Sequence, residues 1–379
     1  MRPRLGLQGW LWAGVVAGLG TALRLVVLAV FGAANDTPAR DLLSKWDAKY
    51  YLAIAEEGYF PTNLSVDGEV HHFTMAFFPG YPYLVRVLTW AGLPTLVAAV
   101  LVSIAATVAL AAAAMMLVAR INPRWRYNDQ PRALAVQVAA AIVVTCAPMT
   151  IVMTMPYTEA LFGALSLWAL VALCDRRWVL AGLLTAAAAA TRLTAVDLIA
   201  AFGLTVLIWG RKDPRAWTGL FISPLPLVAY LGWTNEHLAD AGGYFGIQEE
   251  NWSSGFDFGA ATVKWVADKL TTSTEAGYLL TCLVIITAPL LLVAAWKKVP
   301  WPVWFFSAAL IANILLSNGI MHSRPRLLLP AVVLLVPFAA QGVTAPSVTR
   351  RFTWLALTAW AIFGAWFSAY MLAVFPWAI

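Results

Sequence analysis

Apolar runs suited to crossing a lipid bilayer recur along this chain of 379 residues. A hydrocarbon core about 30 Å thick needs about 20 helical residues. The candidate spans are 10–31, 93–119, 133–155, 157–173, 179–192, 195–209, 217–236, 275–296, 301–318, 327–343 and 352–375. Only 12% of the residues are charged and 61% are hydrophobic, against about 25% and 45–50% in soluble domains. We therefore expect an all-α polytopic protein of the cell membrane, with about 11 transmembrane helices in one domain over residues 1–379.

The pieces between residues 157 and 209 are short for a bilayer. Either two of them merge into one span, or they are half-buried helices that line a cavity. The sequence leaves both interpretations open.

The basic residues predict an orientation. With the N-terminus inside, 15 of the 25 Lys and Arg fall in six short inner loops or tails, namely those holding Arg2 and Arg4; Arg120, Arg124, Arg126 and Arg132; Arg176 and Arg177; Arg211, Lys212 and Arg215; Lys297 and Lys298; and Arg350 and Arg351. The positive-inside rule therefore predicts a cytoplasmic N-terminus and an extracytoplasmic C-terminus. Because the basic residues lie in short loops between apolar runs, the net charge of +6 does not indicate a nucleic-acid partner.

Two long segments, about 32–92 and 237–274, then lie outside the membrane. Both alternate apolar, aromatic and charged residues, which predicts interfacial helices in contact with membrane lipids. The first contains Trp46-Asp47, where Asp47 could act as a general base on an acceptor hydroxyl. A solvated carboxylate paired with Lys45 or Lys49 is the alternative.

An apolar face follows this aspartate along the chain. Trp46, Tyr50, Tyr51 and Ile54 recur at helical spacing, and we expect them to hold the segment on the bilayer surface.

Charged side chains at membrane depth cost about 2.5–3.5 kcal/mol each at a helix centre, so each needs a reason. Arg24 is the deepest, whereas Glu159, Arg192 and Asp197 lie at outer ends of spans. Tyr157 and Glu159 could line a polar cavity. Arg192 could bind phosphate or form a structural ion pair with Glu159 or Asp197.

A late basic group, His322 to Arg326, lies on the same outer side. Two guanidiniums, of Arg324 and Arg326, at a helix start favour phosphate binding, although a snorkelling belt is the alternative. His71 and His72 are adjacent but have no further ligands nearby, so the sequence favours no metal site and no special role for them, although they share a loop with Asp47 and could contact a sugar. We expect no metal and no other cofactor.

These motifs together resemble a known family. The pattern in the first outer segment is Trp46-Asp47, then Tyr51-Leu52-x-Ile54-Ala55-x-x-Gly58-Tyr59, then Phe77-Phe78-Pro79-Gly80-Tyr81-Pro82. It resembles the PIG-V family of polytopic GT-C-type mannosyltransferases. Further matches are Tyr157-Thr158-Glu159-Ala160-Leu161-Phe162, Thr191-Arg192-Leu193-Thr194, and the arginine-rich stretch from Arg324 to Pro330.

The resemblance implies a GT-C fold and transfer of mannose from a polyprenyl-phosphate-mannose donor to a lipid-anchored acceptor on the extracytoplasmic face. An Ala-, Arg- and Trp-rich composition favours a bacterial member, and hence a glycolipid or lipoglycan as the lipid-linked glycan acceptor. Asp47 would be the catalytic base. Donor phosphate would be held by Arg324, Arg326 and Arg192, and the substrates contacted by Trp46, Tyr50, His71, His72, Tyr157, Glu159 and His322.

The residues fit this chemistry. When a hydroxyl attacks a β-linked phospho-sugar in line, the configuration at the anomeric carbon is inverted. Phosphate leaves without help from a general acid. One carboxylate therefore suffices, whereas glycoside hydrolysis needs two. Arginines stabilise the leaving phosphate. The same fold could instead use another polyprenyl-phospho-sugar, such as arabinose or glucose. A lipid or solute transporter is the other alternative, but it should show discontinuous helices in paired halves, and no such symmetry is found.

Overall fold

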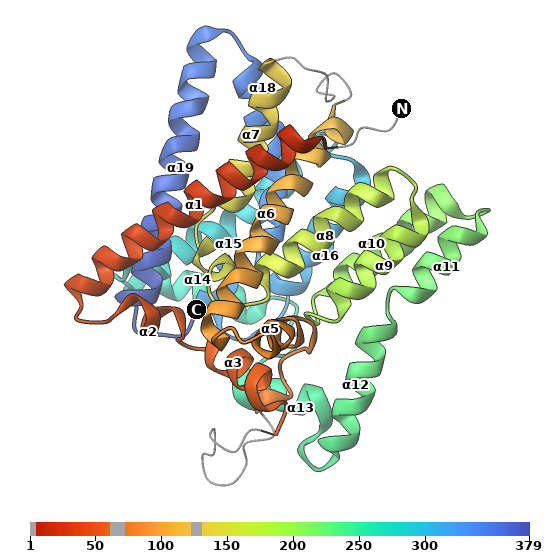
Figure 1. The fold of residues 1–379 in the computed structure, drawn as a ribbon, viewed down its shortest axis with the longest axis vertical. Coiled ribbons are helices and arrows are strands. Elements are labelled where there is room, and N and C mark those ends of the chain that lie inside the picture. The colour runs from red at the N-terminus through yellow and green to blue at the C-terminus, as the bar shows by residue number, and fades with distance from the viewer. Residues whose placement is uncertain (1–4, 61–72, 123–130) are drawn as a thin grey trace.

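The computed structural model describes residues 5–60, 73–122 and 131–379, and within these ranges the regular structure is helical (Figure 1). The α-helices are α1 (Leu7–Ala34), α2 (Ala39–Leu43), α3 (Ala48–Glu57), α5 (Gly80–Trp90), α6 (Thr95–Ile121), α7 (Pro131–Thr145), α8 (Glu159–Cys174), α9 (Trp178–Ala189), α10 (Ala195–Thr205), α11 (Pro214–Ile222), α12 (Leu225–His237), α13 (Gly243–Trp252), α14 (Ala260–Thr272), α15 (Ala276–Ala294), α16 (Trp301–Leu315), α17 (Arg324–Leu327), α18 (Val336–Thr344) and α19 (Ser347–Ala373). Shorter helical turns are η2 (Thr150–Met153), η3 (Val206–Gly210), η4 (Ala239–Ala241), η5 (Met321–Ser323) and η6 (Leu329–Leu335).

The multi-pass all-α class is confirmed, whereas the count of eleven spans is not. Among the described residues, five helical runs are long and apolar enough to cross a membrane: Leu7–Ala34, Thr95–Ile121, Pro214–His237, Ala276–Ala294 and Ser347–Ala373. The bent pair Met321–Leu327 and Leu329–Thr344, with 57° between its parts, would make a sixth. The other expected spans coincide with apolar helices of 10–17 residues. At 1.5 Å per residue, such helices are shorter than a bilayer core.

The bundle is assembled around α6, which packs against α1, α7 and α8 (Figure 1). Ala111 to Ala114 on α6 are fully buried. Small side chains allow neighbouring helix backbones to approach closely, which is the usual way that helices associate without a hydrophobic driving force from water. Farther along the chain, α9 packs on α8 and α11, and α10 packs on α16.

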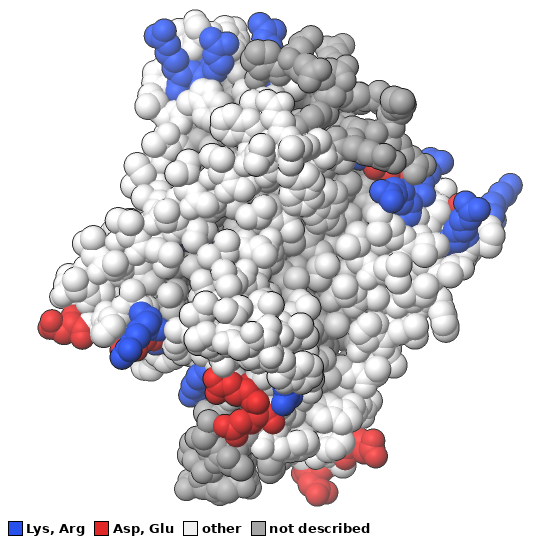
Figure 2. Space-filling view, in the orientation of Figure 1, with Lys and Arg blue, Asp and Glu red and all other residues white. Residues whose placement is uncertain are grey.

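The two long segments expected outside the membrane meet at one end of the bundle, where α2, α3, α5 and α13 lie together in Figure 1. Figure 2 shows Lys and Arg gathered at the opposite end, beside the connection between α18 and α19, and near the loops of α8 to α11. Most acidic residues on this face lie at the end that carries α3 and α13. Under the positive-inside rule this distribution favours the orientation predicted above, which stays a prediction.

The apolar face of α3 packs on the protein. Tyr51 and Ile54 are buried, and α3 lies against α5 and α6. Trp46 and Tyr50 are partly buried against the same core. The expectation that this face rests on the bilayer surface is therefore wrong for Tyr51 and Ile54, because their apolar area is covered by neighbouring helices before lipid can reach it.

Arg24 explains how a charge is tolerated inside α1. Its side chain is 2% exposed, and Nη1 donates to the carbonyl of Thr145 at 2.7 Å while Nη2 donates to the hydroxyl of Thr21 at 3.0 Å. Longer contacts reach the hydroxyls of Thr150 and Thr154. Arg24 thus ties α1 to the end of α7 and to η2, and its role is structural.

We expect Arg24→Leu to lower the free energy of unfolding by about 1–3 kcal/mol, because the Thr145 carbonyl and nearby hydroxyls lose their donor inside the protein. The measurement is the thermal unfolding midpoint of the purified protein in detergent. Arg40→Leu is the control, since the Arg40 side chain is 80% exposed. Equal midpoints for the two variants would contradict the structural role of Arg24.

Candidate active site

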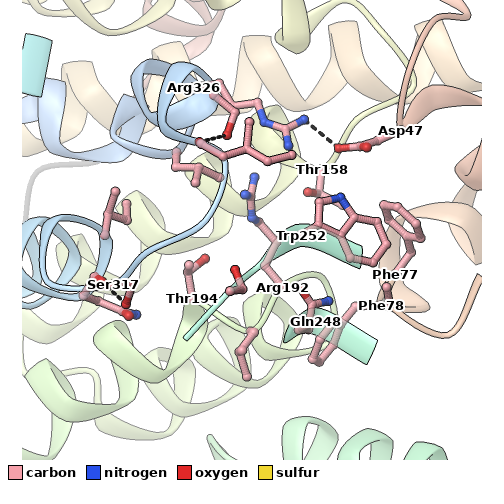
Figure 3. Close-up of a pocket in the computed structure, with 18 of the residues that line it drawn as sticks. Asp47, Phe77, Phe78, Thr158, Arg192, Thr194, Gln248, Trp252, Ser317 and Arg326 are labelled. Carbon is pink, nitrogen blue, oxygen red and sulfur yellow. Dashed lines mark hydrogen bonds and ion pairs between the residues drawn. The ribbon is translucent and has the colours of Figure 1, made fainter. Parts of the chain in front are cut away.

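A cavity of about 500 Å³ lies at the end of the bundle where the outer segments meet (Figure 3). Its walls come from the start of α3, the turn before α5, the start of α8, the turn between α9 and α10, α13, the end of α16, and α17. Six residues predicted as site residues line it: Asp47, Tyr157, Glu159, Arg192, Arg324 and Arg326. Residues up to 279 positions apart are therefore brought into one site.

Asp47 is held at the first turn of α3. The preceding residue, Trp46, has a left-handed φ of 59°, an uncommon conformation for a residue other than glycine. The backbone N–H of Asp47 donates to the hydroxyl of Tyr157 at 3.2 Å. Its carboxylate Oδ2 accepts from Nη1 of Arg326 at 2.8 Å, and these two side chains are only 17% and 13% exposed.

The alternative pairing of Asp47 with neighbouring lysines is wrong. Nζ of Lys45 donates to the carbonyl of Leu372 at 3.3 Å. Nζ of Lys49 lies 4.7 Å from the centre of the Tyr50 ring. The carboxylate instead contacts a guanidinium from the other end of the sequence.

Glu159 links this pair to a second arginine. Its Oε1 lies 2.6 Å from Nη1 of Arg192 and 3.7 Å from Nε of Arg326. The side chain of Glu159 is 3% exposed, and it belongs to the first turn of α8, where a helix favours negative charge. Asp47, Arg326, Glu159 and Arg192 thus form a row of alternating charges, which we call the ion-pair row. The sequence left open whether Arg192 pairs with Glu159 or Asp197, and the structure shows Glu159.

Aromatic rings support both arginines of the ion-pair row. The guanidinium of Arg326 lies 5.1 Å from the centre of the Tyr157 ring, and that of Arg192 lies 5.8 Å from the Phe162 ring. Burial raises the pKa values of Tyr51 and Tyr244, which also line the cavity, above the ordinary range of a phenol. Since these phenols are neutral at pH 7, they cannot serve as the base there.

Arg324 differs from Arg326 in its contacts. Its Nη1 donates to the hydroxyl of Thr262 and its Nη2 to the carbonyl of Ser317, both at 2.5 Å. The helix α17 that carries both arginines is a single turn of four residues. Pro325 lies in this turn, where its missing N–H is tolerated. The structure therefore ties Arg324 to α14 and to the end of α16, while Arg326 reaches the ion-pair row.

Three other predicted site residues do not line the cavity. Trp46 and Tyr50 lie next to it, and Tyr50 stacks on Phe77 at 5.1 Å between ring centres. His322 packs against two aromatic rings. The centre of its ring lies 6.0 Å from that of Tyr278 and 5.3 Å from that of Phe375. His71 and His72 fall outside the described residues.

The motif from Phe77 to Pro82 joins the first outer segment to the turn that carries Arg192. The N–H of Gly80 donates to the carbonyl of Ala190 at 2.7 Å. A Cβ at this position would lie 2.7 Å from the same oxygen, so only glycine fits. Phe77 and Phe78 line the cavity, and the hydroxyl of Tyr81 donates to the carbonyl of Ala99 on α6. The motif thus fixes Arg192 relative to Asp47.

Sequence reasoning missed one wall of the cavity. Its polar and aromatic residues are Thr194, Tyr244, Gln248, Trp252, Ser254, Asn313, Ser317 and Asn318. Thr194 lies within a recognised motif, but the others are scattered over segments with no local pattern. Only their meeting in the fold marks them.

No cluster of three or more His, Cys, Asp or Glu that could hold a metal ion occurs among the described residues. The expectation of a metal-free reaction stays a prediction. The charged groups that the cavity does offer are carboxylates paired with guanidiniums, which suit proton transfer and phosphate binding.

The fold first defines a class. Over 97% of this chain and 76% of the other, the structure is similar to that of ArnT from Cupriavidus metallidurans bound to undecaprenyl phosphate, with a TM-score of 0.53 and 14% sequence identity. At that identity the likeness shows the fold alone, which is of the GT-C type.

A family model also matches part of the sequence. Residues 29–206 match the family of mannosyltransferases described as PIG-V, which confirms the predicted resemblance. No curated protein sequence matches the chain. The matched stretch is just under half of the chain, so the chain is similar to PIG-V mannosyltransferases over residues 29–206 and to ArnT in its fold.

We expect Gly80→Ala to lower glycosyl transfer at least tenfold, because the added Cβ pushes the turn of Ala190 and Arg192 away from Asp47. Overpacking should also cost about 1–3 kcal/mol of folding free energy. Transfer and thermal unfolding are measured on the same preparation. Gly18→Ala on α1 is the control, since a Cβ there meets no atom within 4 Å. Unchanged transfer by Gly80→Ala would show that the contact does not position the site.

Proposed function

We propose that the protein transfers mannose from a polyprenyl-phosphate-mannose donor to a hydroxyl of a lipid-anchored acceptor, a glycolipid or lipoglycan, on the extracytoplasmic face. The observation that carries the proposal is the 2.8 Å contact between the Asp47 carboxylate and the Arg326 guanidinium, two side chains that line the cavity and are only 17% and 13% exposed. The family match supports mannose as the sugar. The undecaprenyl phosphate bound by ArnT supports a polyprenyl phosphate as the carrier.

Asp47 is the general base in this proposal. Its carboxylate takes the proton of the acceptor hydroxyl as that oxygen attacks the anomeric carbon from the side opposite the phosphate. The new glycosidic bond forms, the bond from the anomeric carbon to the phosphate oxygen breaks, and its electron pair leaves with the polyprenyl phosphate. The anomeric configuration is inverted. Phosphate is a good leaving group, so no second carboxylate has to donate a proton.

Arg326 and Arg192 stabilise the negative charge that grows on the leaving phosphate. A guanidinium has five N–H donors in a planar fork, so Arg326 can bind phosphate with one edge and stay near Asp47 with another. Arg324 is a weaker candidate for the phosphate, because its Nη atoms are already bonded to Thr262 and Ser317.

Glu159 is a positioning residue in this scheme. One of its oxygens contacts both arginines, so it sets the distance between them. It also keeps the ion-pair row neutral overall, because two carboxylates match two guanidiniums. Without that neutralisation, two adjacent buried guanidiniums would repel each other in a medium of low polarity.

Asp47→Asn tests the base. We expect transfer to fall by about 10² to 10⁴-fold, as for the loss of a general base, while undecaprenyl phosphate still binds. Transfer is followed by mass spectrometry with a panel of polyprenyl-phospho-sugars and a membrane lipid extract, so that the donor sugar and the acceptor are identified together. Asp41→Asn is the control, because Asp41 is exposed on α2.

Near wild-type turnover by Asp47→Asn would contradict the assignment of the base. Transfer from a different polyprenyl-phospho-sugar would correct the donor. If no donor supports transfer and another lipid or solute stabilises the protein against heat, a transporter becomes the better interpretation.

Glu159→Gln tests the positioning role. We expect kcat to fall about tenfold or more without a rise in the KM of the donor, because the arginines keep their positive charge but lose their common partner. Asp175→Asn is the matched control, since it removes the buried ion pair with Arg120 far from the cavity. That variant should lose stability and keep kcat. A rise in donor KM with kcat unchanged would contradict the role given to Glu159.

A further inference from the structure

One end of the cavity is built from neutral polar side chains that the mechanism above does not use. In Figure 3, Ser317 and Thr194 lie on the far side of Arg192 from Asp47. Asn313, Asn318 and Ser254 line the cavity as well. Thr194 precedes α10, Asn313 belongs to α16, and α10 packs on α16. We call these five residues the amide lobe.

The amides of the lobe are fixed in orientation by the surrounding protein. Nδ2 of Asn313 donates to both carboxylate oxygens of Asp197, at 3.2 Å each. Oδ1 of Asn318 accepts from the backbone N–H of Gly255. Asn313 therefore keeps its Oδ1 as an acceptor, and Asn318 keeps its Nδ2 as a donor. A fixed acceptor on α16 and a fixed donor shortly after the end of α16 thus line the cavity.

The hydroxyls of the lobe complete this set. Oγ of Ser317 donates to the carbonyl of Asn313 at 2.7 Å, so its lone pairs stay available. The hydroxyl of Thr194 does not cap α10. Nη2 of Arg324 donates to the carbonyl of Ser317 and so holds this part of the wall in place. Arg324, predicted as a phosphate ligand, thus supports the lobe.

This chemistry suits a neutral sugar. The hydroxyl groups of a sugar both donate and accept hydrogen bonds. The amide and hydroxyl side chains of the lobe together offer both kinds of partner. The carboxylate nearest the lobe, Asp197, is bonded to Asn313 and does not line the cavity, so the lobe offers no counterion to an amino sugar. The ring of Trp252, edge-on to Phe77 with 5.9 Å between ring centres, adds a flat apolar surface to the cavity on the Asp47 side of Arg192.

We infer that the amide lobe is a subsite for the hydroxyl groups of a neutral pyranose. This inference rests on the proposed function and deepens it, because it names residues that recognise the sugar apart from those that handle phosphate and proton. The pyranose can belong to the donor or to the glycan of the acceptor. Both present the same hydroxyl chemistry, and the experiment separates them.

The experiment uses Thr194→Val and Asn318→Asp. The first removes one hydroxyl at nearly constant shape. The second keeps the oxygen that accepts from Gly255 and replaces the Nδ2 donor. Matched controls are Thr218→Val on α11, where Thr218 is exposed, and Asn251→Asp on α13, where Asn251 does not line the cavity.

Two quantities are measured for each variant. One is the dissociation constant of undecaprenyl-phospho-mannose divided by that of undecaprenyl phosphate. Any effect of a substitution on phosphate binding cancels in this ratio. The other is the KM of an alkyl mannoside used as acceptor. A rise of about 2- to 12-fold in this ratio, as for the loss of one hydrogen bond to the sugar, would place the donor sugar in the lobe. A rise of that size in the acceptor KM alone would place the acceptor glycan there.

If both lobe variants match their controls in both quantities, the inference is overturned. That outcome differs from a failure of the proposed function, which shows as transfer that survives Asp47→Asn. The binding ratio needs no turnover, so the lobe is tested even in a protein that lacks transfer.

Discussion

The rest of the site depends on one buried row of alternating charges, Asp47, Arg326, Glu159 and Arg192. Taking a charge out of water costs several kcal/mol, and the cost is recovered only when each charge has a close partner. Asp47 and Arg326 meet at 2.8 Å, and Glu159 and Arg192 at 2.6 Å. Because four separate segments supply these side chains, the row can form only when the helices and the first outer segment are correctly packed.

The packing that supports this row uses contacts of a different kind. Apolar faces of α3 and α5 pack on α6, and Gly80 lets the first outer segment touch the turn before Arg192. Arg24, although charged, contributes by donating hydrogen bonds to neutral oxygens of α7 and η2. Charges in this protein therefore divide into those that pair with one another in a cavity and those that brace backbone and hydroxyl groups.

Much of the site could be predicted from local sequence. The Trp46-Asp47 motif was noticeable as a carboxylate on an amphipathic segment, and the outer arginines because charge at membrane depth is costly and rarely kept without a role. The partners of these residues were harder to predict. Arg324 and Arg326 differ by two positions, yet one bonds Thr262 and the other Asp47, because side chains on a one-turn helix point in different directions. His322 contacts aromatic rings and lies away from the cavity.

The sequence by itself determined the membrane-embedded helical class, the family resemblance and the candidate base, because composition, run length and a continuous motif are properties of neighbouring residues. The tertiary structure decided which residues pair with the candidate base and line the cavity around it. The ion-pair row and the amide lobe join residues separated by more than a hundred positions, such as Asp47 and Arg326 in the row and Thr194 and Asn313 in the lobe. Such contacts leave no periodic signal along the chain, since they depend on how helices cross in space. The number of spans also depends on helix lengths and bends, as at the 57° break before η6, which hydropathy does not reveal.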